Sequence, residues 1–353
     1  MSNKDSQDVS MFPHYVNFLK ENRTKEQAIQ IFENRIKDSY EVYSKFKQFF
    51  FERDCPVCGN NENRSLPKFH DRYEVKECLA CTTRFVSPCP AMDALTYYYN
   101  ECKCNALFGN LLRSRNKSGN IIISERIDFI LNLIDEHFKD SDLIRILEIG
   151  CSSGVFLSEI KEAMRGKFPN KKISLHGIDI DVTAIKKNVD SEISLSAESA
   201  ESYAVSTKER YDLVLHFELI EHLQNPYDFM ISVKNLLNQN GLHHFHTPNA
   251  NGFDNVAIGY NEFRPLAHGI FPPMHLQSFT PMNIVHFSLR TGFKVVQVDT
   301  PGNFDVDIVR TFLSSADSYF KDIALIPENY LAVFQNWLKK LNSSSHLRVT
   351  LKK

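Results

Sequence analysis

The sequence predicts an α/β fold built around a doubly wound, mostly parallel sheet. Three observations predict it: apolar strands alternate with amphipathic helices, a turn bracketed by glycines joins the first strand to a helix, and an aspartate ends the second strand. Parallel strands need crossover connections, so this alternation is typical of such a sheet. The predicted strands lie at residues 144–149, 173–179, 211–216, 242–247, 294–298 and 346–351.

The predicted helices carry their own start and stop signals. Residues 124–138 have apolar side chains at helical spacing and lead into the first strand. Thr280 and Pro281 are suited to the N-cap and first turn of a helix at 281–290, and Gly292 follows its end. The other predicted helices cover residues 155–165, 226–237 and an insertion at 303–345. This insertion is well placed to form a lid.

Length and composition indicate a core domain with an appendage. The chain has 353 residues, 42% of them hydrophobic, which exceeds one typical domain and suffices for a packed core. Its 41 basic and 43 acidic residues leave a net charge of −2, which argues against bulk attraction to nucleic acid or an anionic membrane. The sequence has no apolar run long enough for a membrane span, and residues 1–10 are too polar for a signal peptide. We therefore expect a soluble, cytoplasmic protein, of an oligomeric state that the sequence leaves open.

Four segments are predicted along the chain. Residues 1–52 form a helical extension, residues 53–90 a small zinc ribbon, and residues 91–123 a linker or cap. Residues 124–353 form the α/β domain.

Two Cys-x2-Cys turns predict the zinc ribbon. Cys55 and Cys58 form one pair and Cys78 and Cys81 the other, a separation at which four thiolates can surround one zinc ion tetrahedrally. Gly59 supplies the tight turn that such a site needs. Closed four-cysteine sites are structural, so we expect no chemistry at this metal. Ordinary thiols are expected at Cys89, Cys102 and Cys104.

The turn after the first strand predicts a site for a cationic, nucleoside-containing ligand. Gly150 and Gly154 carry no side chain that would keep the backbone away from a ligand. A dinucleotide site would have a glycine where Ser152 stands, and Glu148 suits a cation better than a pyrophosphate. Asp179, at the end of the second strand, can accept hydrogen bonds from both ribose hydroxyls.

These residues resemble motif I of the class I S-adenosylmethionine-dependent methyltransferases, which reads E-x-G-x-G-x-G and is met at Glu148, Gly150 and Gly154. The resemblance implies a Rossmann-like sheet of seven strands, with S-adenosylmethionine as the cofactor. It further implies that Asp179 binds the ribose and Ile180 one face of the adenine. The implied cofactor contacts are Glu148, Gly150, Cys151, Gly154, Asp179, Ile180, Glu198 at the adenine edge and His216 at the methionine portion.

A second group of functional side chains follows the strand at 211–216. Ligands of open α/β sheets bind beyond the carboxyl ends of the strands, so Glu218, Glu221 and His222 should face the reactive end of the cofactor. Their spacing places all three on one helical turn. Such a set suits either a hard divalent cation or a histidine base held by carboxylates.

The run F-E-L-I-E-H-L-Q-N-P at 217–226 is similar to the corresponding segment of ubiquinone-biosynthesis O-methyltransferases, as are residues 247–249 and 275–281. The resemblance covers about residues 144–298. In related small-RNA 2′-O-methyltransferases the matching residues hold a divalent metal, and in sugar methyltransferases with an N-terminal zinc module the histidine that matches His222 is a general base. The implied metal ligands are Glu218, Glu221, His222 and His275, with His268 as a rival for the last.

The sequence therefore predicts methyl transfer from S-adenosylmethionine to a hydroxyl of a small molecule, sugar or glycan, similar to bacterial sugar and glycan methyltransferases. Tyrosines at 97–99 are expected either to cover the ligand or acceptor entrance or to pack in the core. His244 and His246 share one face of their strand, where a structural role is favoured over one in lining the acceptor pocket. The expected cofactors are S-adenosylmethionine, a structural Zn²⁺ and, if the second group binds a metal, Mg²⁺ or Mn²⁺. The alternatives are an RNA 2′-O-methyltransferase, which the charge balance disfavours, and a non-catalytic zinc-ribbon scaffold.

Overall fold

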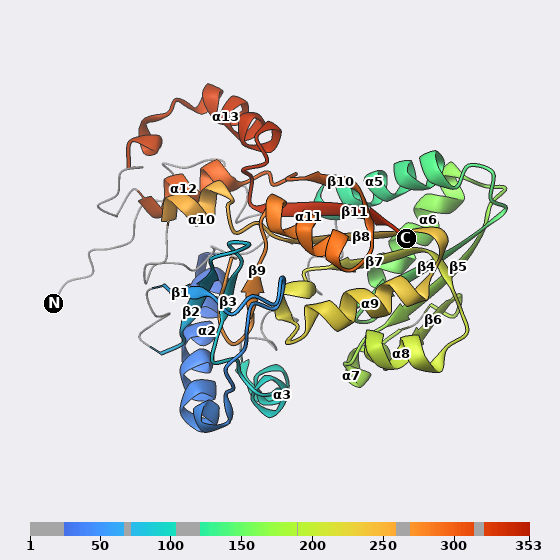
Figure 1. Cartoon of the computed structure of the whole chain (residues 1–353). Coiled ribbons are helices and arrows are strands. Elements are labelled where there is room, and N and C mark those ends of the chain that lie inside the picture. The colour runs from blue at the N-terminus through green and yellow to red at the C-terminus, as the bar shows by residue number, and fades with distance from the viewer. Residues whose placement is uncertain (1–24, 67–71, 104–120, 189, 259–268, 314–320) are drawn as a thin grey trace.

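The computed structural model of the protein describes residues 25–66, 72–103, 121–188, 190–258, 269–313 and 321–353. Its centre is a sheet of seven strands in the order β10-β11-β8-β7-β4-β5-β6 (Figure 1). Only β11 runs antiparallel to its neighbours, which confirms the predicted α/β, mostly parallel, seven-stranded fold. In chain order the strands are β4 (Leu143–Ile149), β5 (Lys172–Ile178), β6 (Ile193–Ser196), β7 (Tyr211–Phe217), β8 (Leu237–Pro248), β10 (Lys294–Asp299) and β11 (His346–Lys352).

Helices cover both faces of this sheet. The apolar sides of α5 (Ile121–His137) and α6 (Val155–Lys167) pack on one face in a single buried cluster. The opposite face is covered by α8 (Ala200–Ser206), α9 (Pro226–Leu236) and α11 (Pro281–Arg290). Burial of each large apolar side chain in these layers contributes roughly 1.5 to 3 kcal/mol, which makes the two clusters the main source of stability.

Local capping signals set where these helices begin. Thr280 accepts a hydrogen bond from the Asn283 main-chain N–H, and the Asn283 side chain accepts one in return from the Thr280 main chain. Pro281 occupies the first turn, as the sequence predicts. The shorter helices of the domain are α7 (Val182–Ile185), η3 (Ile220–His222) and α10 (Phe253–Ile258).

A second, four-stranded sheet joins the N-terminal part of the chain to the α/β domain. Its strands are β1 (Asn63–Ser65), β2 (Val75–Cys78), β3 (Arg84–Val86) and β9 (Gln277–Ser278), all antiparallel. The strand β9 comes from the distant segment that links α10 to α11, and it lies beside β3 in Figure 1. The cysteine-containing segment is therefore paired directly with the α/β domain.

The helices α2 (Lys25–Phe46), η2 (Lys47–Phe49) and α3 (Met92–Glu101) lie against this small sheet. Val42, Tyr73, Val86 and Tyr98 share a buried cluster that fills the space between them. In this way the helical N-terminal segment packs on the sheet that carries the cysteines.

The described parts of 303–345, before the last strand, are largely helical. They contain α12 (Asp305–Leu313), η4 (Lys321–Leu325) and α13 (Glu328–Lys340). The side chain of Gln335 joins α13 to the start of α12 by donating to the Asp305 carboxylate at 2.5 Å and to the Gly302 carbonyl at 2.7 Å. Among the helices within the described ranges, none has the length and apolar character needed to cross a membrane.

Candidate active site

The turn between β4 and α6 brings main chain close to the space above the sheet. Gly150 and Gly154 both have φ of 77°, in the left-handed region that favours glycine. On the neighbouring strand, a Cβ atom on Gly177 would lie 2.6 Å from the sulfur of Cys151. The close fit between the turn and β5 therefore depends on the absence of a side chain at Gly177.

Asp179 is held against the same turn. One carboxylate oxygen accepts from the Ser152 main-chain N–H and the other from the Asp181 main-chain N–H, each at 2.8 Å. The next side chain, Ile180, is 73% exposed, so an apolar surface remains open beside the carboxylate. A carboxylate next to an open apolar surface suits the ribose and the adenine of one nucleoside.

Glu148 is a buried carboxylate that suits a cationic ligand. Burial, and then the negative charge of Asp179, raises the pKa of Glu148 to about 8. Its Oε2 atom has no hydrogen-bond partner among the described residues. Because a bound cation would favour the ionised form, this orphaned oxygen fits the ammonium and sulfonium of S-adenosylmethionine.

The segment after β7 differs from the expected helical turn. Glu218 has a φ of 51°, and the 3₁₀ turn η3 begins only at Ile220, so the three predicted residues do not share one helical turn. The left-handed backbone at Glu218 breaks the helical spacing that the sequence predicts for the three residues. The Glu218 carboxylate lies 2.9 Å from the Arg126 guanidinium and 3.6 Å from Nε2 of His346.

The imidazole of His222 is held in one tautomer. Its Nδ1 lies 2.8 Å from the Met274 carbonyl oxygen, which can only accept, so Nδ1 carries the proton and Nε2 keeps a lone pair. The Tyr99 hydroxyl lies 3.1 Å from the same Nδ1, which places one of the predicted tyrosines at this site. Burial lowers the pKa of His222 to about 4, so the ring is neutral at neutral pH.

Glu221 and His275 complete the cluster around His222. Glu221 is fully buried, and one carboxylate oxygen accepts from the Thr247 hydroxyl at 2.9 Å. Burial, and then the charge of Glu218, holds the pKa of Glu221 well above its usual range. The ligand atoms of Glu221, His222 and His275 all lie within 4.8 Å of one another.

The predicted four-residue metal set is therefore corrected to three residues. Glu218 is not part of the cluster because its carboxylate is already paired with Arg126. His268 lies outside the described residues. Sequence reasoning missed Arg126, Met274 and His346, since each reaches the site through a long-range contact that leaves no local pattern.

The structure encloses His216 in the core. Its ring stacks on Phe245 at 4.6 Å between ring centroids and also contacts Phe229 and His243, with no exposed surface. His244 and His246 do share one strand face, where their rings lie 5.3 Å apart. Glu198 is partly buried and accepts from the Ser206 hydroxyl at 3.1 Å.

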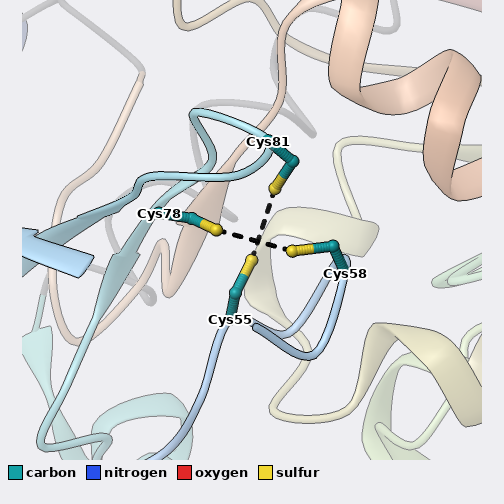
Figure 2. Close-up of side chains that lie close together, drawn as sticks. All are labelled: Cys55, Cys58, Cys78 and Cys81. Atoms are coloured by element: carbon teal, nitrogen blue, oxygen red, sulfur yellow. Dashed lines mark hydrogen bonds between the residues drawn. The ribbon is translucent and has the colours of Figure 1, made fainter. Parts of the chain in front are cut away.

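The four predicted cysteines point toward a common centre, as Figure 2 shows. The sulfurs of Cys55 and Cys81 lie 3.5 Å apart and those of Cys58 and Cys78 lie 3.4 Å apart, and all four lie within 4.8 Å of one another. Burial raises the pKa of Cys58 to about 11, while a hydrogen bond from Cys55 lowers the pKa of Cys81 to about 4, so without a cation the four sulfurs would share protons and not all be thiolates. The donor set and its arrangement fit a tetrahedral zinc site.

The sequence profile of a methyltransferase domain family matches residues 122–298, which include the glycine turn, Asp179 and the cluster around His222. The chain belongs to this methyltransferase family. Its α/β unit is thus a class I S-adenosylmethionine-dependent methyltransferase domain.

Curated relatives of this methyltransferase are O-methyltransferases. A ubiquinone biosynthesis O-methyltransferase from Rickettsia bellii is 25% identical over 141 residues, which cover 36% of this chain and 53% of the relative. The corresponding protein from Rickettsia canadensis is 26% identical over 125 residues, 33% of this chain and 48% of the relative. The methyltransferase thus spans about half the length of the curated relatives that it matches.

Parts of the chain also align with solved methyltransferase structures at low sequence identity. A S-adenosylmethionine-dependent methyltransferase from Archaeoglobus fulgidus has a TM-score of 0.45 and 18% identity, and covers 70% of this chain and all of its own. The plantazolicin methyltransferase BamL, solved with S-adenosylhomocysteine, has a TM-score of 0.47 and 16% identity, with coverage of 73% and 93%. These likenesses carry no argument about the acceptor of this methyltransferase.

Proposed function

We propose that the protein transfers the methyl group of S-adenosylmethionine to a hydroxyl of a small molecule, sugar or glycan, with His222 as the general base. The observation that carries this proposal is the hydrogen bond from His222 to the Met274 carbonyl. With Nδ1 protonated, Nε2 would be the nitrogen that accepts a proton, in the turn that follows β7. In the reaction, Nε2 would take the hydroxyl proton while the oxygen–carbon bond forms and the sulfur–carbon bond breaks.

The surroundings of His222 support its role as a base. Protonation would create an imidazolium whose Nε2 lies 3.8 Å from the Glu221 carboxyl group. Burial lowers the pKa of His222 to about 4, which keeps the imidazole in the base form at neutral pH and also makes it a weaker proton acceptor than an exposed histidine. In-line methyl transfer depends mainly on alignment, so a neutral base in a fixed tautomer is sufficient.

Two features support oxygen as the acceptor atom. The curated relatives are named as O-methyltransferases, and they match about a third of the chain. Next to the catalytic turn, Glu218, Arg126 and His346 are partly exposed and offer both hydrogen-bond donors and acceptors. Groups of both kinds complement hydroxyls, as on a sugar, better than they complement a purely apolar molecule.

For the cofactor, we propose that Glu148, Gly150, Cys151 and Gly154 hold the amino-acid part and the sulfonium. Asp179 and Ile180 would hold the nucleoside, with Glu198 at the adenine edge. His216 is enclosed by core side chains. We therefore propose that His216 packs beneath the site and supports the residues that contact the cofactor.

A metal-assisted version of the reaction has its own support. Glu221, His222 and His275 supply one carboxylate and two imidazoles, a set that suits Mn²⁺ or another transition metal better than Mg²⁺. Such an ion would polarise the acceptor hydroxyl and lower its pKa. An RNA acceptor is the weaker alternative, because the net charge of −2 provides no broad attraction to phosphates.

We also propose that Cys55, Cys58, Cys78 and Cys81 bind one structural zinc ion. We propose that the chain is divided into residues 1–52, 53–90, 91–123 and 124–353, with the zinc ribbon at 53–90. A scaffold function alone would leave the orphaned Glu148 oxygen and the oriented His222 without a role.

The test is to incubate the protein with labelled S-adenosylmethionine and fractionated cell extract, and to identify the labelled product by mass spectrometry. We expect a methyl ether on a hydroxylated small molecule, sugar or glycan, formed by the wild type and not by His222→Ala. Label in RNA would favour the RNA alternative, and label on nitrogen or carbon would contradict the proposed acceptor atom. His286→Ala is the matched control, because His286 is exposed on α11.

A further inference from the structure

A partly buried arginine, Arg53, bridges the cysteine segment and the catalytic turn. Its Nε donates to the Val86 carbonyl on β3 at 3.0 Å, and its Nη1 donates to the Gln224 carbonyl, just after the catalytic turn, at 3.0 Å. Its Nη2 donates to the Leu276 carbonyl at 2.7 Å and to the Gln277 side chain at 3.2 Å. These acceptors are neutral oxygens on three separate segments, so the guanidinium acts here as a geometric connector.

The side chain of Gln277 extends this connection to the turn itself. Gln277 is fully buried in β9, and its Nε2 donates to the carbonyls of Ile220 at 2.7 Å and Leu223 at 2.9 Å. These two residues flank Glu221 and His222. One amide group therefore holds both ends of the segment that carries the proposed base.

The main chain beside Gln277 makes the third connection. The Leu276 N–H donates to the Glu221 carbonyl at 2.8 Å, while the Leu276 carbonyl accepts from Val86 of β3. Met274, which accepts from His222, lies on the same short strip. The strip from Met274 to Gln277 thus contacts the catalytic turn on one side and the cysteine-bearing sheet on the other.

A short 3₁₀ turn has few internal hydrogen bonds and needs outside partners to keep one shape. In η3 those partners are Gln277 and Leu276, and Arg53 binds both of them. Arg53 also stands two positions before Cys55 in the chain. Arg53 therefore connects the cysteine segment by hydrogen bonds to the strip that orients His222.

We infer that Arg53 and Gln277 are positioning residues through which the four-cysteine segment sets the orientation and tautomer of His222. The inference rests on the proposed function of His222 as base or ligand. It assigns the N-terminal module a role in catalysis that does not require contact with the cofactor or the acceptor.

The test compares Gln277→Met and Arg53→Lys with the wild type. Gln277→Met keeps side-chain length and removes the donor, and Arg53→Lys keeps the charge and removes the planar set of donors. Arg290→Lys is the matched control, since Arg290, at the end of α11, also donates to the cysteine segment, at the Val57 carbonyl between Cys55 and Cys58. All variants are measured with intact full-length protein.

Three readouts separate positioning from general stability: the ¹⁵N chemical shifts that report the His222 tautomer, the hydrogen exchange of the Leu276 amide, and the affinity for S-adenosylmethionine. We expect mixed His222 tautomers and at least about tenfold faster Leu276 exchange in Gln277→Met and Arg53→Lys. The affinity for S-adenosylmethionine should stay within about twofold, and Arg290→Lys should match the wild type.

An unchanged tautomer and unchanged Leu276 exchange in both variants would overturn the inference. Equal changes throughout the protein, including in Arg290→Lys, would show a structural role only and also overturn it. If the proposed function itself were wrong, His222→Ala would show normal turnover. That result can be told apart from the results that would overturn the positioning role of Arg53 and Gln277. If Arg53→Lys does not fold, Gln277→Met decides the question alone.

Discussion

Nδ1 of His222 donates to the main-chain carbonyl of Met274 at 2.8 Å, although the two residues are far apart in the chain. This one bond fixes which nitrogen carries the proton and therefore which nitrogen can act on a substrate. It also makes the site depend on the strip from Met274 to Gln277, which pairs with the cysteine-bearing sheet. Through this strip, the cysteine-bearing sheet is connected to the proposed base.

We predict that His222→Ala lowers turnover by roughly a hundredfold or more and leaves affinity for S-adenosylmethionine within about twofold. The reason is that His222 would act on the acceptor hydroxyl, while the cofactor contacts that we propose lie on β4, β5, the turns after them and Glu198 after β6. Rate measurements with the identified acceptor and calorimetry with S-adenosylmethionine check the two parts. Near-normal turnover would rule out His222 both as base and as essential metal ligand.

Asp179→Ala should weaken binding of S-adenosylmethionine by at least about tenfold, because hydrogen bonds to an ionised acceptor are worth roughly 1.5 to 3 kcal/mol. Asp181→Ala is the matched control. Asp181 is the neighbouring carboxylate and caps α7 by accepting from Thr183 and Ala184. Calorimetry that found equal affinity for wild type and Asp179→Ala would place the ribose elsewhere.

Much of this arrangement is predictable from sequence because its signals are local. The glycines at 150 and 154, the aspartate after β5 and the two Cys-x2-Cys turns each encode their geometry within a few residues. The error at Glu218 has a physical cause: a run of helix-compatible residues does not reveal that one of them adopts a φ of 51° to pair with Arg126. Gln277 was equally hidden, since its role depends on strand pairing between distant segments.

Glu148 should make cofactor binding depend on pH. Its pKa in the free protein is about 8, and a cationic ligand favours the ionised form. Binding therefore releases a proton, and affinity for S-adenosylmethionine should rise as the pH increases toward about 8 and then level off. Glu148→Gln should bind more weakly and lose this dependence. Calorimetry in buffers of different ionisation enthalpy measures the released proton, and a pH-independent wild type would contradict the assignment.

The raised pKa of Glu148 also predicts how the stability of the cofactor-free protein depends on pH. The pKa of Glu148 in the folded protein is raised above its ordinary value, so the folded state holds this proton more tightly than the unfolded chain does. The resulting contribution to the free energy of unfolding is fully present below about pH 4.5 and is lost as the pH rises through about 8. Glu148→Gln cannot ionise, so it should be more stable than the wild type at pH 8.5 by on the order of a few kcal/mol. Denaturant unfolding without cofactor at pH 5 and pH 8.5 checks the sign. If Glu148→Gln were less stable than the wild type at pH 8.5, the claim that burial destabilises the ionised Glu148 carboxylate would be wrong.

Metal analysis of protein purified without added zinc should find one zinc ion per chain, since thiolates this close repel one another without a cation. Cys58→Ser should lose this zinc and unfold at a lower temperature, whereas Cys89→Ser should keep it. Cys89 is a buried cysteine that stands outside the cluster, which makes it the control. Folded wild type with four freely reactive thiols and no zinc would end this assignment.

The last prediction separates a base from a metal ligand at His222. The cluster of Glu221, His222 and His275 is compact enough for an ion, yet the pairing of Glu218 with Arg126 removes one of the oxygen ligands that a hard cation prefers. We therefore expect activity to survive a chelator that removes weakly bound ions and leaves the structural zinc in place. Metal analysis of the treated protein must confirm that the zinc remains. Loss of activity with the chelator, and its return with Mn²⁺, would instead favour the metal-assisted reaction. His275→Gln gives an independent answer, because it should reduce activity strongly only if His275 holds an ion beside His222.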